Sequence, residues 1–184
     1  MSKSPIIQHS SESNEWYTPG EVLELVREVL DGIELDPASC PEANAVVGAR
    51  HIFTKEMDGL ARAWTCRSFF CNPPYGWFDH VGGTSNLAAW TKHGLGEFTR
   101  GEAGKGIFLV KAAPSVGWFA PLWDHPICFP YRRVDFWRPR GATGAPHDSA
   151  IVYLGDEPWR FEEVFQRIGR VVTRVTPDTR AKAA

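Results

Sequence analysis

The sequence predicts an α/β fold, in which a single, mostly parallel sheet is flanked by helices. Two apolar runs, at 69–71 and 107–110, have the length and turn-bounded setting of strands that are buried inside a sheet. Between Val22 and Leu30 the apolar residues recur at helical spacing. Buried strands together with an amphipathic helix indicate one layered domain.

The composition describes a globular domain with a substantial core. Of 184 residues, 43% are hydrophobic and 23% are charged, which excludes disordered and fibrous classes. The formal net charge is −2, so any contact with DNA must come from a local basic patch. The cysteines and histidines lack metal-ligand spacing, and no apolar run approaches 18 residues. We therefore expect no metal, no disulfide, no membrane span and a cytoplasmic protein.

The ordered chain is expected to begin with a helix over residues 19–30. Thr18 suits the N-cap, Pro19 suits the first helical position, and Glu21 completes a capping box. The alternative is that the backbone before this helix also borders a cofactor pocket. We expect residues 1–14 to be a disordered lead-in, residues 15–175 to form the domain, and residues 176–184 to be a frayed tail.

A short strand is predicted before Asp36 and Pro37. A carboxylate at the carboxyl end of a strand can bind the ammonium or a ribose hydroxyl of a nucleoside cofactor, although Asp-Pro also opens ordinary turns. No Gly-x-Gly phosphate loop is present, which favours a cofactor without a pyrophosphate. Asp58 and Gly59 form a turn signal, and Asp58 could also accept a hydrogen bond from an adenine amine.

The remaining elements follow from apolar runs and turn residues. We expect weak helix or irregular chain at 40–50, a helix broken near 82–85 within 77–93, and a loop at 94–104. The other expected elements are short strands at 52–54, 127–129, 150–154 and 171–175, and helices at 114–123 and 158–168.

The central motif is Asn72-Pro73-Pro74-Tyr75, which follows a strand predicted at 67–71. The two prolines end the strand ladder because neither can donate a backbone N–H, and they hold the tetrapeptide rigid and extended. Open α/β sheets place their ligands at this end of a strand. The motif is therefore the first candidate for an active site.

Its geometry suits methyl transfer to the exocyclic amine of a nucleobase, whose lone pair is delocalised into the ring. If the side-chain carbonyl of Asn72 and the backbone carbonyl of Pro73 each accept one N–H, the lone pair points toward a methyl donor. Tyr75 offers a flat face for a base taken out of its stack. The plain alternative is a polyproline turn that caps a buried strand, with Tyr75 as a half-buried aromatic residue.

The only dense basic cluster lies at 131–140, where arginines alternate with aromatic residues. This composition is typical of surfaces that bind phosphates and stack on bases. The alternative is a solvated hairpin arm whose arginines pair with carboxylates. The candidate DNA contacts are Arg132, Arg133, Arg138 and Arg140.

An ordered set of segments resembles the phage-type DNA N6-adenine methyltransferases, the Dam-like family of phages and prophages. The resemblance covers roughly residues 14–154. The segments are Glu15-Trp16-Tyr17-Thr18-Pro19, Leu35-Asp36-Pro37-Ala38, Phe53-Thr54-x-x-x-Asp58-Gly59-Leu60, Trp64 and Asn72-Pro73-Pro74-Tyr75-Gly76. Asn-Pro-Pro-Tyr is shared with other amino-methyltransferases, whereas the ordered set is more specific.

The resemblance implies a Rossmann-like S-adenosylmethionine-dependent methyltransferase fold and methyl transfer to adenine N6 in DNA. It also implies a phage or prophage protein in a bacterial host, where protection from restriction or host mimicry would be its use. The adenine site that it implies consists of Asn72, Pro73, Pro74 and Tyr75. The residues that it places at the methyl donor are Tyr17, Thr18, Pro19, Asp36 and Pro37, with Asp58 at the donor's adenine.

The sequence departs from the usual amino-methyltransferase pattern in the first cofactor loop, which is often richer in glycine than residues 36–41 are here. No separate target-recognition domain is visible, so sequence choice would come from loops such as 94–104 and 131–148. Two alternatives stay open. The same fold could act on a protein glutamine or on RNA, or the chain could be a non-catalytic DNA-binding module.

Overall fold

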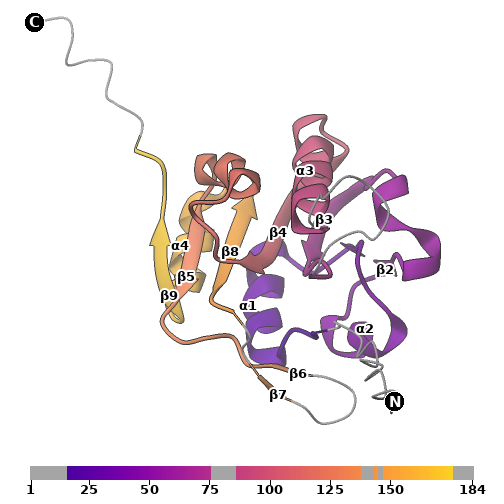
Figure 1. The fold of residues 1–184 in the computed structure, drawn as a ribbon, viewed down its shortest axis with the longest axis horizontal. Coiled ribbons are helices and arrows are strands. Elements are labelled where there is room, and N and C mark those ends of the chain that lie inside the picture. The colour runs from indigo at the N-terminus through magenta and orange to yellow at the C-terminus, as the bar shows by residue number, and fades with distance from the viewer. Residues whose placement is uncertain (1–15, 76–85, 138–142, 145–146, 176–184) are drawn as a thin grey trace, which may run out of the picture.

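The computed structural model describes residues 16–75, 86–137, 143–144 and 147–175. Their centre is a seven-stranded sheet with the strand order β2-β1-β3-β4-β8-β5-β9 (Figure 1). Its strands are β1 (Leu35–Asp36), β2 (His51–Ile52), β3 (Cys66–Cys71), β4 (Ala103–Lys111), β5 (Ile127–Pro130), β8 (Ser149–Leu154) and β9 (Gly169–Val172). A two-stranded ribbon, β6 (Phe136–Trp137) and β7 (Thr143–Gly144), lies outside it.

The sheet has a parallel half and an antiparallel half. Strands β2, β1, β3 and β4 pair in parallel, whereas β8 pairs antiparallel with both β4 and β5, and β9 pairs antiparallel with β5. Five of the seven strands consequently share one direction. The predicted α/β class with one large sheet is confirmed, and the sheet is mixed because β8 runs backward between β4 and β5.

Helices cover both faces of the sheet. Helix α1 (Gly20–Leu30) and helix α4 (Pro158–Phe165) pack together on one face, and helix α3 (Asn86–Thr99) packs on the other. Side chains of β3 and β4 alternate between the two hydrophobic cores, as the period of two in a strand requires. The side chains of 69–71 and 107–110 are fully buried, which confirms that both runs are interior strands.

The predicted loop at 94–104 is wrong, because α3 continues to Thr99 and β4 begins at Ala103. Gly94 suggested a break in the helix, but its role is close packing. A Cβ atom built at Gly94 would lie 2.4 Å from Phe108 and 2.5 Å from Trp64. Glycine at this position lets the helix approach the sheet, and this gain offsets the low helix propensity of glycine.

Other expected elements shift by a few residues. The weak helix at 40–50 is α2 (Pro41–Val47), and the helix expected at 114–123 is the 3₁₀ helix η3 (Gly117–Asp124), which contains Pro121. Two further 3₁₀ turns, η1 (Lys55–Met57) and η2 (Gly59–Ala61), follow β2. The expected lead-in at 1–14, the tail at 176–184 and the helix interruption at 82–85 lie outside the described residues.

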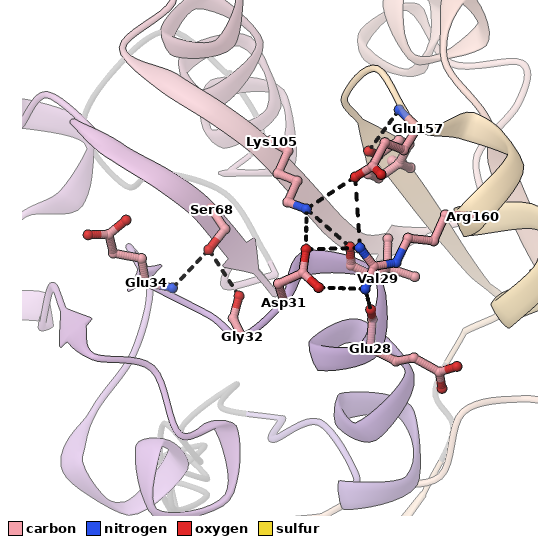
Figure 2. A network of polar contacts seen from close by, with 10 residues as sticks. Glu28, Val29, Asp31, Gly32, Glu34, Ser68, Lys105, Glu157 and Arg160 are labelled. Carbon is pink, nitrogen blue, oxygen red and sulfur yellow. Dashed lines mark hydrogen bonds and ion pairs between the residues drawn. The ribbon is translucent and has the colours of Figure 1, made fainter.

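An ion-pair network joins the end of α1 to β4 and α4 (Figure 2). Asp31 caps α1 in the left-handed conformation, with φ of 57°, and its carboxylate binds Arg160 at 2.5 and 2.9 Å and Lys105 at 2.9 Å. Arg160 also donates to the Glu28 carbonyl, and Lys105 contacts Glu157. This network lies at the amino ends of the parallel strands, so it braces the edge opposite the Asn-Pro-Pro-Tyr motif.

No helix among the described residues is both long enough and apolar enough to cross a membrane.

Candidate active site

The motif begins where the buried strand β3 ends. Strand β3 runs to Cys71, so Asn72 is the first residue beyond it, between the carboxyl ends of β1 and β4. Asp36, the last residue of β1, is close enough that its charge, after burial, contributes to raising the pKa of the Cys71 thiol. Two candidate groups that lie 36 positions apart in sequence are therefore neighbours at one edge of the sheet.

The amide of Asn72 is fixed by its nitrogen and leaves its oxygen free. Nδ2 donates to the Trp16 carbonyl at 2.7 Å and to the Thr18 hydroxyl at 3.2 Å. Oδ1 is buried and has no hydrogen-bond partner among the described residues. An unpaired buried acceptor costs about 1–3 kcal/mol, so this oxygen is poised to accept a donor from a ligand.

The predicted helix over 19–30 is confirmed, but the predicted capping box is wrong. Pro19, in an extended conformation, is the N-cap of α1, and its carbonyl accepts from the Val22 and Leu23 amides. No side-chain hydrogen bond caps this helix. The Thr18 hydroxyl is buried and accepts from Asn72 instead. Thr18 therefore serves the site, and not the end of the helix.

Tyr75 lies at the far end of the motif and is half-buried. Its ring centroid is 5.9 Å from that of His147, and the two planes are tilted by 46°. Burial, with a smaller contribution from Cys71, raises the pKa of the Tyr75 phenol, which therefore stays neutral at physiological pH. Of the two prolines between Asn72 and Tyr75, Pro73 is buried and Pro74 is exposed. Gly76 and the residues up to 85 lie outside the described part of the chain.

Asp36 is a buried carboxyl group, 3% exposed, without a cationic partner among the described residues. Burial raises its pKa from 3.8 to about 6, although a hydrogen bond from the Ala38 amide at 3.1 Å favours the charged form. The buried Ser39 hydroxyl beside it also favours the charged form. This turn can accept a cation or a hydroxyl donor.

The turn after Asp36 is packed against the turn at Asp58. Phe53 binds both sides of the first turn, donating to the Asp36 carbonyl and accepting from the Ser39 amide. A Cβ atom at Gly59 would lie 2.1 Å from the Pro37 carbonyl, so only glycine allows this approach. Asp58 is exposed and accepts from the Leu60 amide at 3.2 Å. This bond matches the interpretation of Asp58 as a turn residue.

Tyr17 pairs with Trp137, the last residue of β6. Each residue donates its backbone N–H to the carbonyl of the other, at 2.9 and 3.1 Å, and their rings meet edge to face at 4.9 Å. The Tyr17 hydroxyl also lies 3.2 Å from the Cys40 thiol. Figure 1 shows the β6–β7 ribbon beside the start of α1. The segment before α1 thus extends this ribbon.

The arginine cluster is only partly described. Arg132 is exposed, and Arg133 pairs with Asp148 at 2.9 Å, on the surface. That pair matches the carboxylate-paired alternative for Arg133. Arg138 and Arg140 lie outside the described residues.

Two surface hollows lie away from Asn72. The larger, of about 460 Å³, is lined by residues of β2 and the turns after it and reaches Leu35, the residue before Asp36. The smaller, of about 280 Å³, lies beside β9 and is lined by Trp123 and Arg174 among others. The described residues contain no group of three or more His, Cys, Asp or Glu side chains that could hold a metal ion.

Sequence patterns did not single out Ser39 or Trp137 as parts of the site. Ser39 directly follows the Asp36-Pro37-Ala38 turn, so its position was the available signal. Trp137 stood within the aromatic and basic cluster but was interpreted with its neighbours as a DNA contact. Its contact with Tyr17 spans 120 positions and has no local signature.

Fold and candidate site together define a class: an α/β protein with a buried, unpaired amide oxygen beside a proline-braced corner at the carboxyl edge of its sheet. The chain belongs to the DNA N-6-adenine-methyltransferase (Dam) family, whose model matches residues 7–143, about three quarters of its 184 residues. The Dam relationship predicted from the ordered motifs is thereby confirmed. A search of curated proteins found no match.

Proposed function

We propose that this protein transfers a methyl group from S-adenosylmethionine to N6 of an adenine flipped out of DNA. Membership of the Dam family supports the reaction and the DNA substrate. The observation that carries the residue assignment is the buried, unpaired Oδ1 of Asn72, whose amide nitrogen is already bound on both sides. The mixed sheet is then a Rossmann-like scaffold for the reaction.

In this proposal Asn72 Oδ1 accepts one N–H of the adenine amine, and the Pro73 carbonyl accepts the other. Both acceptors face the same nitrogen, so its lone pair is withdrawn from the purine ring and becomes nucleophilic. Because the Asn72 amide and the proline backbone are fixed beforehand, little reorganisation is needed as charge develops. Afterwards the methylated nitrogen loses one proton to solvent, and no dedicated base is required.

Tyr75 is proposed to stack on the flipped adenine. A neutral, half-buried phenol ring can cover a base without adding charge to the pocket. Flipping costs a few kcal/mol of lost stacking, and an aromatic contact of about 1–3 kcal/mol offsets part of this cost. Pro74, which lies between the acceptors and the ring, keeps their spacing rigid.

The donor side of the site fits S-adenosylmethionine, which supplies an electrophilic sulfonium methyl group when bound. Its ammonium or ribose hydroxyls match the buried Asp36 carboxyl, which has no cationic partner among the described residues, with the Ser39 hydroxyl beside it. Tyr17, Thr18, Pro19 and Pro37 would border the donor. We propose Asp58 for its adenine amine.

The test offers labelled S-adenosylmethionine and the purified protein to separate pools of DNA, RNA and protein. The proposal predicts label in DNA alone, recovered as N6-methyl-2′-deoxyadenosine after digestion to nucleosides. Label on protein glutamine or in RNA would show that the methyl acceptor is not adenine in DNA. A chain that binds DNA but neither binds the donor nor labels any pool would be a DNA-binding module.

A further inference from the structure

We propose that Trp137 is a positioning residue that fixes the amide of Asn72 through the segment 16–18. The proposal rests on the function proposed above for Asn72. It adds a mechanical connection between the basic cluster at 131–140, which carries the candidate DNA-binding arginines, and the acceptor that orients adenine. No motif of the sequence assigns this role to Trp137.

The first link is the attachment of Trp137 to residues 17 and 18. Two backbone hydrogen bonds join it to Tyr17, at 2.9 and 3.1 Å, and the two rings pack at 4.9 Å. Its indole Nε1 also approaches the Thr18 carbonyl at 3.4 Å. A residue held by both backbone groups, its ring and its indole is fixed in register and in rotation.

The second link runs from this segment to Asn72. In extended chain the N–H and C=O of one residue point to one side, and the carbonyl of the preceding residue points to the other. Tyr17 faces Trp137, so the Trp16 carbonyl faces Asn72 and accepts from its Nδ2 at 2.7 Å. The Thr18 hydroxyl accepts from the same nitrogen at 3.2 Å.

Together these links determine where Oδ1 points. A planar amide whose nitrogen is held by two acceptors has one remaining orientation, and its oxygen is then fixed as well. Both acceptors belong to residues that flank Tyr17, whose backbone pairs with Trp137. Loss of the Trp137 contacts would release the acceptors, and the amide could rotate to satisfy Oδ1 within the protein. The adenine amine would then meet a misplaced acceptor.

The consequence is coupling between DNA and chemistry. Arg132 and Arg133 precede β6 by three to four residues. A displacement of these arginines would therefore be transmitted to Tyr17 through Trp137. DNA bound at these arginines would be connected through Trp137 to the acceptor, which is already fixed in the free protein. Trp137 need not contact either substrate to do this, so its substitution should lower kcat.

The test compares Trp137→Ala, Trp137→Phe and Trp159→Ala. Trp159 is an exposed tryptophan on α4, 62% exposed, so its loss is matched in size but remote from the site. We expect Trp137→Ala to lower kcat at least tenfold at saturating DNA and donor. Both variants keep the backbone N–H and C=O of residue 137, but Trp137→Phe also keeps the ring contact and should stay within about threefold of wild type, as should Trp159→Ala.

A second measurement needs neither DNA nor donor. The side-chain NH2 signals of Asn72, assigned by their loss in Asn72→Ala, should be protected from solvent exchange in the wild type and exposed in Trp137→Ala. Unchanged protection in that variant would overturn the proposal, whatever the enzyme methylates. If wild-type protein methylates nothing while the NH2 signals respond as expected, the proposed function fails and the positioning role stands.

Trp137→Leu serves as a second variant if the alanine variant does not fold. It keeps apolar bulk against Tyr17 but lacks the indole and the aromatic edge. The same loss of kcat and of NH2 protection is expected, at constant melting temperature. A folded leucine variant with wild-type kcat and protected Asn72 signals would refute the role of Trp137.

Discussion

Two buried polar groups at the carboxyl edge of the sheet are costly to the folded protein. Asn72 Oδ1 has no partner among the described residues, and burial raises the pKa of Asp36 to about 6. Natural proteins satisfy most buried polar groups, and exceptions concentrate at functional sites. Both groups gain partners if an amine and a cationic nucleoside bind where we propose.

Asp36→Asn is expected to stabilise the ligand-free protein at neutral pH. The pKa of Asp36 lies near 3.8 in the unfolded chain and at about 6 in the folded protein, so the folded protein binds the proton more tightly. The free energy of unfolding therefore falls as pH rises from about 4 to 6, and the penalty is complete above pH 6. We expect a gain of about 2–3 kcal/mol at pH 7.5 that vanishes near pH 4, measured by urea unfolding.

The same variant should lose donor binding. If the donor's ammonium pairs with Asp36, wild-type binding near pH 6 should release a proton, which calorimetry in buffers of different ionisation enthalpy detects. An Asp36→Asn protein that binds S-adenosylmethionine as tightly as wild type, without the proton release, would remove Asp36 from the donor site.

Thr18 shows why single residues are the hardest to assign from sequence. Thr-Pro before an apolar periodic segment matches a helix start, and α1 does begin there. The hydroxyl nevertheless binds Asn72, which is 54 positions away. Local patterns carry no information about such a partner, so the motif positions were predictable and their contacts were not.

At the scale of elements, local pattern and burial agree for the interior strands and for α1. The apolar runs 69–71 in β3, 107–110 in β4 and 150–154 in β8 are buried, so any fold of this composition would enclose them. The loop expected at 94–104 was wrong because Gly94 serves a contact with Trp64 and Phe108 that only the packed helix reveals. Glycine alone does not distinguish a break from a close approach.

Asp31→Asn is expected to destabilise the protein at neutral pH. Hydrogen bonds from Arg160 and then Lys105 lower the pKa of Asp31 from 3.8 to about 2. The stabilisation is therefore present above about pH 4 and is lost as pH falls from 4 toward 2. Since the side chain is 61% exposed, solvent screening reduces the effect to about 1 kcal/mol.

Urea unfolding between pH 2 and pH 7 measures this difference. The variant and the wild type should converge at the acid end of the range. Asp124→Asn is the control, because Asp124 makes an exposed pair with Arg174 at the far edge of the sheet. A loss for Asp31→Asn that does not depend on pH would assign the effect to hydrogen bonds that the asparagine amide does not reproduce, and not to the charge of the carboxylate.

At the scale of the whole molecule, the order of the strands was not predictable from the sequence. The apolar runs identify strands, but whether β8 pairs with β4 or with a later strand depends on contacts between distant segments. What the class did predict is where the candidate residues lie relative to the sheet. Strands β1 and β3 are parallel neighbours, so Asp36 and Asn72 had to meet at one edge.

DNA binding should depend on the basic cluster at 131–140 more than on net charge, because the whole chain carries a formal charge of −2. We expect Arg132→Ala to weaken DNA binding and to reduce the slope of log K against log salt by about one. Arg67→Ala removes the same charge at the opposite edge of the sheet, where Arg67 is 85% exposed, and should leave the slope unchanged. Fluorescence anisotropy across a salt series measures both slopes, and equal slopes for the two variants would remove the basic cluster from the DNA interface.

The most direct measurement of the central claim is single-turnover methylation of adenine-containing DNA by Asn72→Ala, together with calorimetry of donor binding. The account predicts that N6-methyladenine formation falls by at least a thousandfold, while the dissociation constant for S-adenosylmethionine stays within about threefold of wild type. Methylation at the wild-type rate by Asn72→Ala would contradict the account, because the free amide oxygen would then have no part in readying the amine.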